Sequence, residues 1–285
     1  MIGLVVVNYN DYKNTISFIN SISDYKLIKY IVIVDNCSTD DSYSKLEKIC
    51  NDKISLLKND SNKGYGSGIN LGSKFLIENG VKTIIVSNTD IIINSESDLR
   101  KATSYIKDDV VLVGPKVLEK GGVNRGWKIP SVWDDCLLNI PVIHRKLRKK
   151  LLFYKDSFYD DSVTYVEAVS GCFFVISADA LKEVGFFDEN VFLYYEENII
   201  AYKFKEKGYK ALIVNDVSVI HNHSVTIDNS MNRIKKYKAL KRSQKYFHRN
   251  YTRAGIFGRS LLFITDKIML FLLYIAVEIH KIIGK

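Results

Sequence analysis

The chain has 285 residues, of which 47% are hydrophobic, so it is long and apolar enough to bury a full α/β core, and disorder is excluded. The net charge of +9 is uneven: residues 229–285 hold 13 Lys and Arg against two acidic residues, whereas residues 1–228 hold 28 against 30. Such a basic tail is typical of proteins that bind an anionic membrane surface, a phosphorylated ligand or nucleic acid. The four cysteines form no C-x-x-C pair, which favours reduced thiols in a cytosolic protein over a disulfide scaffold.

Apolar runs alternate with helical patterns from the first residues, which predicts βαβ units around a mostly parallel central sheet flanked by helices. The expected strands are 2–7, 30–34, 54–57, the run that starts at Thr83, 110–113 and 172–176. The N-terminus has no basic leader before its apolar run, so we expect a first strand there and no signal peptide.

Polar side chains follow two of these strands, in the segments 35–41 and 88–90. In an open α/β sheet, ligands bind beyond the carboxyl ends of the strands, and a carboxylate such as Asp90 there suits a divalent metal that carries phosphate. The alternative is that Asp90 caps the helix expected near 95–106 or closes a turn.

Two further segments interrupt the βαβ pattern. The glycine-rich stretch 62–72 lacks both the G-K-[ST] of a P-loop and a G-x-G-x-x-G after a strand, so neither standard nucleotide-binding loop is expected. Residues 121–161 hold two Trp, two Pro and the basic run 144–150, and we interpret them as an insertion that forms a substrate or acceptor surface. A solvated charged loop is the alternative for the basic run.

Seven blocks of this sequence, in order, resemble the family-2 inverting glycosyltransferases of GT-A fold, in particular the rhamnosyl- and galactosyl-transferring branch of bacterial surface polysaccharide synthesis. The resemblance covers about residues 2–224. The blocks are Val5–Asn10, Val34–Asp40, Asn62–Asn70, Asn88–Asp90, Ser170–Cys172, Gly185–Glu197 and Val219–His221.

The resemblance implies roles for individual residues. Asp35 would read the nucleobase of the donor, and Asn62-x-Gly64 would lie against the nucleoside. Asn88-x-Asp90 looks like a variant of the family's Asp-x-Asp, in which Asp90 holds Mn²⁺ or Mg²⁺ on the donor diphosphate, and His221 (or His223) would complete the metal shell. The donor-binding residues implied in this way are Asn8, Asn10, Asp35, Asn36, Asn62, Gly64, Asn70 and Asn88.

The catalytic base implied by the resemblance is Glu197, with Glu196 beside it. Two departures bear on this assignment: the family usually has Asp at position 197, and the acid often found two residues later is Ile199 here. The base has therefore shifted to Glu196, or the enzyme tolerates Glu at 197, or activity is reduced. Compensation of a helix dipole by first-turn acids is the alternative role for both glutamates.

The resulting hypothesis is a GT-A catalytic domain in residues 1–228 and basic, amphipathic helices in 229–285. The enzyme would transfer a sugar from a dTDP- or UDP-sugar to a hydroxyl of a glycan or lipid-linked glycan, in the synthesis of capsule, O-antigen or cell wall. One alternative is a binding module of the same fold that has lost catalysis. A nucleic-acid binder that uses the basic segment 233–249 is disfavoured, because it has no RNA-recognition or helix-turn-helix signature.

The C-terminal tail is the most hydrophobic part of the chain, but the uncharged stretch Ile268–Val277 has only ten residues, too few to span a bilayer. On a helix, the polar residues of the tail fall within one arc of about half the circumference. They are Arg259, Asp266, Lys267, Glu278, His280 and Lys281. We therefore expect an amphipathic helix that holds the protein on the inner face of the cytoplasmic membrane. The alternative is docking on the catalytic domain or on a second subunit, as in a homodimer.

Overall fold

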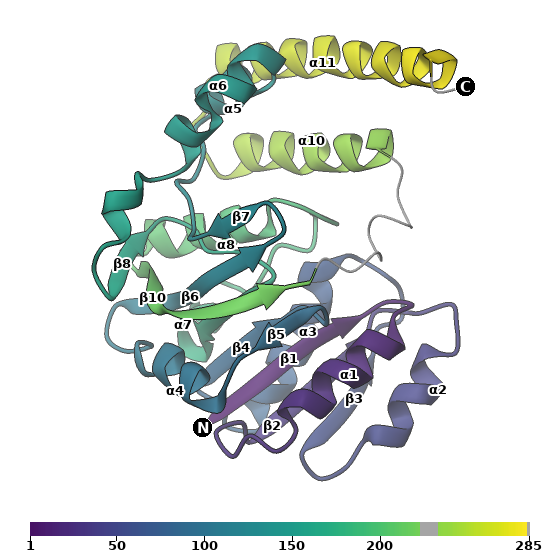
Figure 1. Ribbon diagram of the computed structural model, residues 1–285, viewed down its shortest axis with the longest axis vertical. Coiled ribbons are helices and arrows are strands. Elements are labelled where there is room, and N and C mark those ends of the chain that lie inside the picture. Colours follow the sequence, from purple (N-terminus) through teal and green to yellow (C-terminus); the bar gives the residue numbers. More distant parts are fainter. Residues whose placement is uncertain (223–232, 284–285) are drawn as a thin grey trace.

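The computed structural model describes residues 1–222 and 233–283, with side chains from 234 to 275 in the second range, and Figure 1 shows it. Its centre is one mixed sheet in the order β3-β2-β1-β4-β9-β6-β10-β5, to which β7 is added beside β6 and β8 beside β10. The described strands are β1 Ile2–Asn8, β2 Tyr30–Asp35, β3 Ile54–Lys58, β4 Thr83–Ser87, β5 Ile91–Ile93, β6 Val110–Glu119, β7 Gly122–Asn124, β8 Val163–Val166, β9 Phe173–Ser177 and β10 Lys210–His221. The described α-helices are α1 Tyr12–Ile22, α2 Ser42–Leu46, α3 Tyr65–Glu78, α4 Glu96–Ser104, α5 Val132–Leu138, α6 Pro141–Leu152, α7 Ala178–Glu183, α8 Glu196–Glu206, α10 Arg233–Asn250 and α11 Ile256–Ile283.

The predicted α/β fold is confirmed, and each of the six expected strands is present. Strands β3, β2, β1 and β4 pair in parallel, and the apolar runs of β2, β1 and β4 are buried on both faces, whereas the edge strand β3 is partly exposed. Alternate side chains of β1 enter two cores: Leu4 and Val6 join one cluster with residues of α1, and Val5 joins the other with residues of α3. The sheet becomes mixed at β9, which runs antiparallel between β4 and β6.

The segment 121–161 is more regular than the sequence indicated. It forms β7, α5 and α6, and the basic run 144–150 lies on α6 rather than in a loop. Helix α5 begins with a capping box, in which Ser131 Oγ accepts from the Asp134 backbone and the Asp134 carboxylate accepts from the Ser131 backbone. Helix α5 lies beside α11, with Asn139 Nδ2 donating to Thr265 Oγ1 at 3.0 Å, so the insertion and the C-terminal tail form one unit.

Helices α10 and α11 form a separate layer beyond the sheet, and α11 is outermost (Figure 1). The predicted amphipathic pattern of α11 is present, but one member of its polar arc faces inward: Asp266 is buried and accepts from Lys245 Nζ of α10 at 2.6 Å, whereas Lys267 is exposed. Leu262 and Leu273 are buried on the same side. Glu278, His280 and Lys281 belong to the predicted polar arc, but their side chains lie outside the described residues. Within the described chain, no helix is long and apolar enough to cross a membrane.

Candidate active site

The carboxyl ends of β1 and β2 form the first part of the site. Asn8 and Asp35 are fully buried, and Asn8 Nδ2 donates to Asp35 Oδ1 at 2.9 Å. The other partner of the Asp35 carboxylate is Ser38, which donates from its hydroxyl at 2.6 Å and from its backbone nitrogen at 3.0 Å. The Asp35 carboxylate is therefore held inside the protein by its neighbours. Asn10 and Thr39, which follow β1 and β2, hydrogen-bond each other and are exposed to solvent at this end of the two strands.

The turn after β3 is tied to this edge by amide side chains. Asn36 Nδ2 donates to Asn62 Oδ1 and to the Gly64 carbonyl, both at 3.0 Å. Gly64 has a φ of +102°, and a Cβ there would lie 2.2 Å from the carbonyl oxygen of Phe192. Only glycine fits both the backbone conformation and this close approach. The turn therefore connects the donor-side residues to the loop that precedes α8.

The two remaining predicted donor residues differ in their surroundings. Asn70 is buried, and its amide bonds both the nitrogen and the carbonyl of Phe187, at 2.9 Å each, and Glu189 at 3.0 Å. It joins α3 to the turn before α8, which is a structural role. Asn88, in contrast, is partly exposed at the end of β4, where its backbone nitrogen donates to the Cys172 carbonyl at 2.8 Å.

Asp90 and His221 lie together at the edge of the sheet. Strands β5 and β10 pair antiparallel with His221 opposite Ile91, so the residue before β5 meets the end of β10. The Asn222 nitrogen donates to the Asp90 carbonyl at 2.9 Å, and His221 Nε2 lies 3.3 Å from Asp90 Oδ2. The sequence placed these two residues 131 positions apart, and the fold brings their ligating atoms within reach of one cation. His223 lies outside the described residues.

Two residues that the sequence did not single out surround this pair. Glu119 Oε1, at the end of β6, lies 3.7 Å from His221 Nδ1, and Cys172 lies beside the same ring. Burial lowers the pKa of His221, but hydrogen bonds to Asp90, Cys172 and Glu119 outweigh it and raise that pKa to about 12. The imidazole therefore balances carboxylate charge at a place where a divalent cation could do the same.

The donor set fits Mn²⁺ or Mg²⁺. A carboxylate oxygen and an imidazole nitrogen are both ligands that Mn²⁺ accepts, and Mg²⁺ is usually bound through one or two carboxylates plus phosphate oxygens and water. In the described part of the chain, no group of three or more His, Cys, Asp or Glu side chains is arranged so that it could hold a metal ion. Asp90 and His221 would hold the metal, and most of its coordination sphere would be left for diphosphate oxygens and water.

Glu196 and Glu197 begin α8, after two residues with left-handed backbone conformation, Tyr194 and Tyr195, whose φ angles are 67° and 71°. Glu196 is buried, and within the described structure its Oε1 has no hydrogen-bond partner. Burial and then the charge of Glu197 raise the pKa of Glu196. Burial also raises the pKa of Glu197, which remains partly exposed. The two carboxyl groups therefore have different environments, with Glu197 the more accessible.

Tyr65 connects the two halves of the site. Its hydroxyl donates to the Gly171 carbonyl at 3.4 Å, and a Cβ on Gly171 would lie 3.9 Å from either carboxylate oxygen of Glu197. Burial, and then the charges of Cys172, Glu196, Asp90 and Glu197, raise the pKa of Tyr65 well above its usual value. Gly171 therefore contacts Tyr65 and lies beside Glu197, and its neighbour Cys172 accepts a hydrogen bond from the backbone nitrogen of Asn88, two residues before Asp90.

Ile199, two positions after Glu197, does not line the candidate active site. Ile199 is buried in a cluster with Val191, Tyr195 and Phe247, which is a residue of α10. An acid at position 199 would be buried among these apolar side chains at a high cost in free energy. The difference from the family pattern at this position therefore accompanies the packing of α10 on this chain.

A buried polar network fixes the start of α8 to the C-terminal helices. Asp135 Oδ2 of α5 accepts from the Tyr195 hydroxyl at 2.5 Å and lies 2.7 Å from His248 Nε2 of α10. Gln244 Nε2 donates to the same Tyr195 hydroxyl at 3.1 Å. Asp135, Tyr195, His248 and Gln244 are all buried, so each depends on the others for its hydrogen bonds.

We expect Asp135→Asn to lower the free energy of unfolding by about 1–3 kcal/mol, because the neutral amide oxygen is a weaker acceptor than the carboxylate oxygen toward the Tyr195 hydroxyl and His248. Urea unfolding of the full chain measures this change. The control is Asp179→Asn, which removes an exposed ion pair with Lys82 and should change the stability by less than about 1 kcal/mol. Equal stabilities of the two variants would contradict a structural role for the network.

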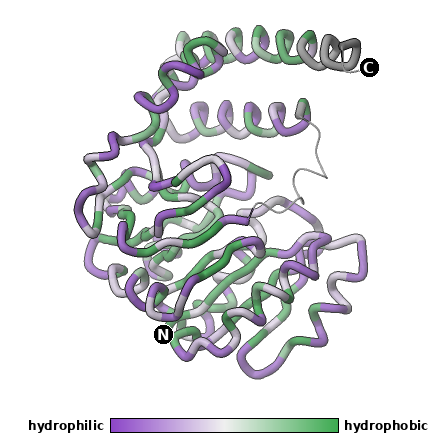
Figure 2. Tube along the Cα trace, in the orientation of Figure 1, coloured by the Kyte–Doolittle hydropathy of each residue, from purple (hydrophilic) through white to green (hydrophobic). Residues whose placement is uncertain are grey.

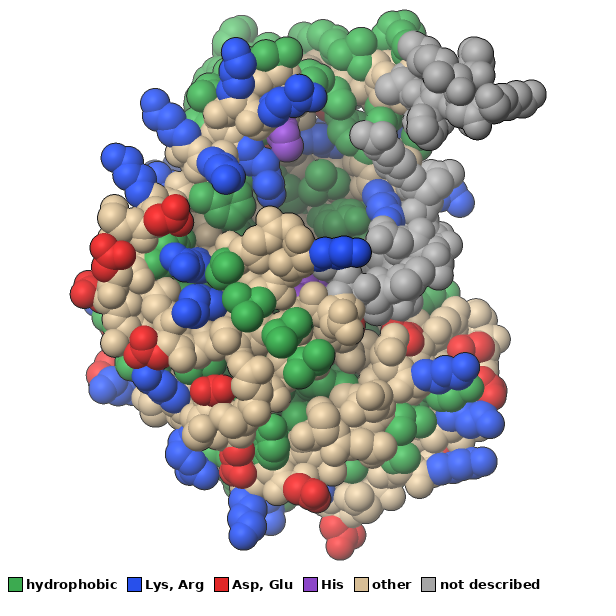
Figure 3. Space-filling model, in the orientation of Figure 1, with side chains coloured by type: hydrophobic (Ala, Val, Ile, Leu, Met, Phe, Trp, Pro, Cys, Tyr) green, Lys and Arg blue, Asp and Glu red, His purple; other side chains and the backbone are tan. Residues whose placement is uncertain are grey.

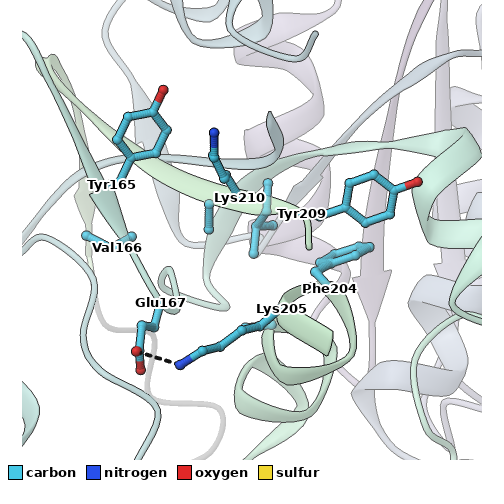
Figure 4. Close-up of a pocket in the computed structure, with 10 residues that line it drawn as sticks. Tyr165, Val166, Glu167, Phe204, Lys205, Tyr209 and Lys210 are labelled. Atoms are coloured by element: carbon cyan, nitrogen blue, oxygen red, sulfur yellow. Dashed lines mark hydrogen bonds and ion pairs between the residues drawn. The ribbon is translucent and has the colours of Figure 1, made fainter. Parts of the chain in front are cut away.

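A cavity lies elsewhere on the molecule. It is a cavity of about 260 Å³ between β8, β10 and α8, with the ion pair of Glu167 and Lys205 at its rim, 2.7 Å apart (Figure 4). Lys210, at the start of β10, lines it, whereas His221 ends the same strand about 35 Å further along. The cavity is therefore separate from the candidate active site, and it is smaller than the roughly 300 Å³ or more of most ligand pockets.

The mixed α/β sheet flanked by helices is the GT-A fold, and solved structures of glycosyltransferases share it. The mannosyltransferase PcManGT from Pyrobaculum calidifontis, in complex with GDP-Man and Mn²⁺, matches with a TM-score of 0.59 at 15% identity, over 100% of this chain and 76% of that one. TarS 1–349 of S. aureus matches with a TM-score of 0.55 at 16% identity, over 92% and 69%. The chain belongs to glycosyl transferase family 2, whose family model matches residues 4–185.

Two curated relatives also match over most of the chain. The low-salt glycan biosynthesis hexosyltransferase Agl10 of Haloferax volcanii is 25% identical over 229 residues, which are 79% of this chain and 68% of the relative. The dTDP-rhamnosyl transferase RfbF of Shigella flexneri is 23% identical over 223 residues, which are 76% and 67%. The predicted family and fold are confirmed, and the individual site residues remain predictions.

Proposed function

We propose that this chain is a metal-dependent inverting glycosyltransferase that moves a hexosyl or rhamnosyl group from a dTDP- or UDP-sugar to a hydroxyl of a glycan or lipid-linked glycan. The product would be a surface polysaccharide such as capsule, O-antigen or cell wall. The names of the two curated relatives, a hexosyltransferase of glycan biosynthesis and a dTDP-rhamnosyl transferase, support this range of donors. The single observation that carries the proposal is the pair of Asp90 Oδ2 and His221 Nε2, 3.3 Å apart, which could together hold one cation.

The donor side of the proposal uses the edge formed by β1, β2 and β4. Asn10, Asn36, the Asn62–Gly64 turn and Asn88 would contact the nucleoside, while Asn8 and Asp35 hold this edge in shape from within. Asp90 and His221 would hold the metal. A bound Mn²⁺ or Mg²⁺ supplies Lewis-acid stabilisation of the charge on the departing diphosphate, worth several kcal/mol.

The acceptor side uses Glu197 as the general base. The acceptor oxygen forms a bond to the anomeric carbon, the bond from that carbon to the diphosphate oxygen breaks, and the acceptor proton passes to the Glu197 carboxylate. Glu197 suits this role better than Glu196, because it is the more accessible carboxylate and lies against Gly171 beside Tyr65. Glu196 would stay buried next to it, where its raised pKa favours the neutral form.

The experiment that tests the proposal is a panel of dTDP-, UDP- and GDP-sugars, screened for thermal stabilisation of the purified chain with and without Mn²⁺ and then for transfer. We expect one donor to raise the melting temperature only with metal present, and nucleoside diphosphate to be released when an acceptor glycan is added. Donor binding without transfer to any glycan acceptor would favour the non-catalytic binding module. Absence of binding to every nucleotide sugar would overturn the proposal.

The proposal also includes a location on the inner face of the cytoplasmic membrane, where a lipid-linked acceptor would be presented. The basic composition of the tail and the arrangement of α10 and α11 support it. A homodimer is the competing explanation for an apolar helix at the outside of the molecule.

A further inference from the structure

Helix α11 exposes a continuous apolar stripe. Phe257, Ile264, Ile268 and Phe271 follow one another at intervals of seven, four and three residues, so at about 100° per residue they share an arc of about 60°. Their exposed fractions are 73%, 52%, 55% and 65%. Leu262, on the opposite side of the helix, is 1% exposed. In Figure 2 hydrophobic residues recur along α11, the outermost helix.

The insertion extends this stripe. Trp133 of α5 is half exposed, and its ring lies 6.0 Å from the ring of Phe257, centre to centre. Ile140 and Val142, at the junction of α5 and α6, are exposed as well. We call the surface formed by these residues and the α11 stripe the apolar face. Its members are Trp133, Leu137, Ile140, Val142, Phe257, Ile264, Ile268, Phe271, Leu272 and Ile275.

The apolar face continues into a cationic helix. After Ile140 and Val142, α6 carries Arg145, Lys146, Arg148, Lys149 and Lys150, all exposed, and it contains no acidic residue. Figure 3 shows the hydrophobic side chains along the edge of the molecule formed by α11, with Lys and Arg side chains on the adjoining surface. A surface that is apolar in the middle and positively charged at one side matches the acyl and headgroup layers of an anionic bilayer.

Contacts on the inner side of α11 fix which side of this helix is exposed. The polar partner of Asp266 is Lys245, so the one acidic side chain described on α11 is used inside the protein. Asn139 Nδ2 bonds Thr265, and the Cys136 thiol lies 3.8 Å from the Gly258 carbonyl, so α5 covers the inner side of α11 as well. The stripe is left outside because α5 and α10 cover the opposite side of the helix, which carries Leu262, Thr265 and Asp266.

We propose that the apolar face, together with the basic residues of α6, docks this chain in the plane of an anionic membrane, with α11 lying in the interface. This deepens the membrane location proposed above by naming its surface, and it adds α5 and α6 to the tail that the sequence indicated. Helix α11 is about 42 Å long and would lie along the surface without crossing it. A second copy of the chain is less suitable as the occupant, because it brings the same excess of cations to the contact, whereas anionic lipids neutralise them.

The test is flotation of the full-length chain with vesicles of phosphatidylcholine alone or of phosphatidylcholine and phosphatidylglycerol in a 7:3 ratio. We expect binding to the anionic vesicles only, weakened by 0.5 M NaCl. Ile268→Glu with Phe271→Glu should lower the bound fraction at least about tenfold, because two inserted apolar side chains become charged. Lys146→Glu with Lys149→Glu should weaken binding mainly at low salt.

The matched control is Val123→Glu with Tyr165→Glu, two residues that are 50% and 55% exposed on β7 and β8 and do not belong to the apolar face. It should float like the unchanged chain. Equal flotation of Ile268→Glu with Phe271→Glu would overturn the proposal. So would a dimer in solution that this variant converts to a monomer, with no vesicle binding by the unchanged chain. Transfer to a water-soluble acceptor should be the same in Ile268→Glu with Phe271→Glu as in the unchanged chain, so failure of docking and failure of the proposed reaction are distinguishable.

Discussion

Asp90→Ala is expected to reduce sugar transfer by at least about 10³-fold, because it removes the carboxylate that would hold the metal on the donor diphosphate. The fold should survive, since Asp90 follows β4 at the edge of the sheet and its backbone carbonyl, which accepts from Asn222, is retained. Initial rates with a Mn²⁺ series measure the first expectation, and far-UV circular dichroism measures the second.

A readout that does not need turnover separates loss of the metal from loss of another function. Nucleotide with Mn²⁺ should raise the melting temperature of the unchanged chain and leave that of Asp90→Ala unaffected. At a nucleotide concentration of a hundred times the dissociation constant, binding adds about 2.7 kcal/mol to the free energy of unfolding. Asp179→Asn, an exposed acid paired with Lys82, serves as the control and should keep both responses. Full turnover of the unchanged chain in excess EDTA would overturn the metal assignment.

The strands and their polar ends could be predicted because they depend on local pattern. A short apolar run such as Thr83–Ser87 is typical of a buried strand. The polar residues that follow such a strand lie at its carboxyl end, where ligands bind in an α/β sheet. The same reasoning placed Asp35 and Asp90 at the ends of strands of one sheet, whereas Asn8 was implied only by the family resemblance. It could not show that Asp35 would be closed off by Asn8 and Ser38, because that depends on the register of β1 with β2 and on the turn after it.

Contacts between distant segments were not predictable in this way. Glu119 meets His221 only because β6 and β10 are neighbours, and Asp135 meets His248 across 113 residues with no shared motif. Which side of α11 faces the protein likewise depends on contacts between distant segments. Its sequence defines an apolar and a polar arc, but which residues are covered depends on Lys245 of α10 being in place to bind Asp266.

Glu197→Gln is expected to lower acceptor transfer by about 10² to 10⁴, the usual contribution of a general base, while the affinity for the nucleotide sugar stays unchanged. The amide keeps the shape of the side chain beside Gly171 but cannot take a proton. Initial rates at saturating donor measure the loss, and titration calorimetry measures donor affinity. Because burial raises the pKa of Glu197 above 4.5 and the base acts deprotonated, the unchanged enzyme should gain activity as pH rises through that pKa, and the variant should lack this rise.

The matched comparison is Glu196→Gln, which changes the neighbouring carboxyl group in the same way. The raised pKa of Glu196 favours its neutral acid, and an amide imitates the neutral acid, so this variant should keep most of its activity. Glu197→Asp, which restores the residue usual in the family, should recover part of the rate lost in Glu197→Gln, because a carboxylate returns on a shorter side chain. A large loss in Glu196→Gln together with a small loss in Glu197→Gln would move the base by one residue, to the buried carboxyl group beside Gly66.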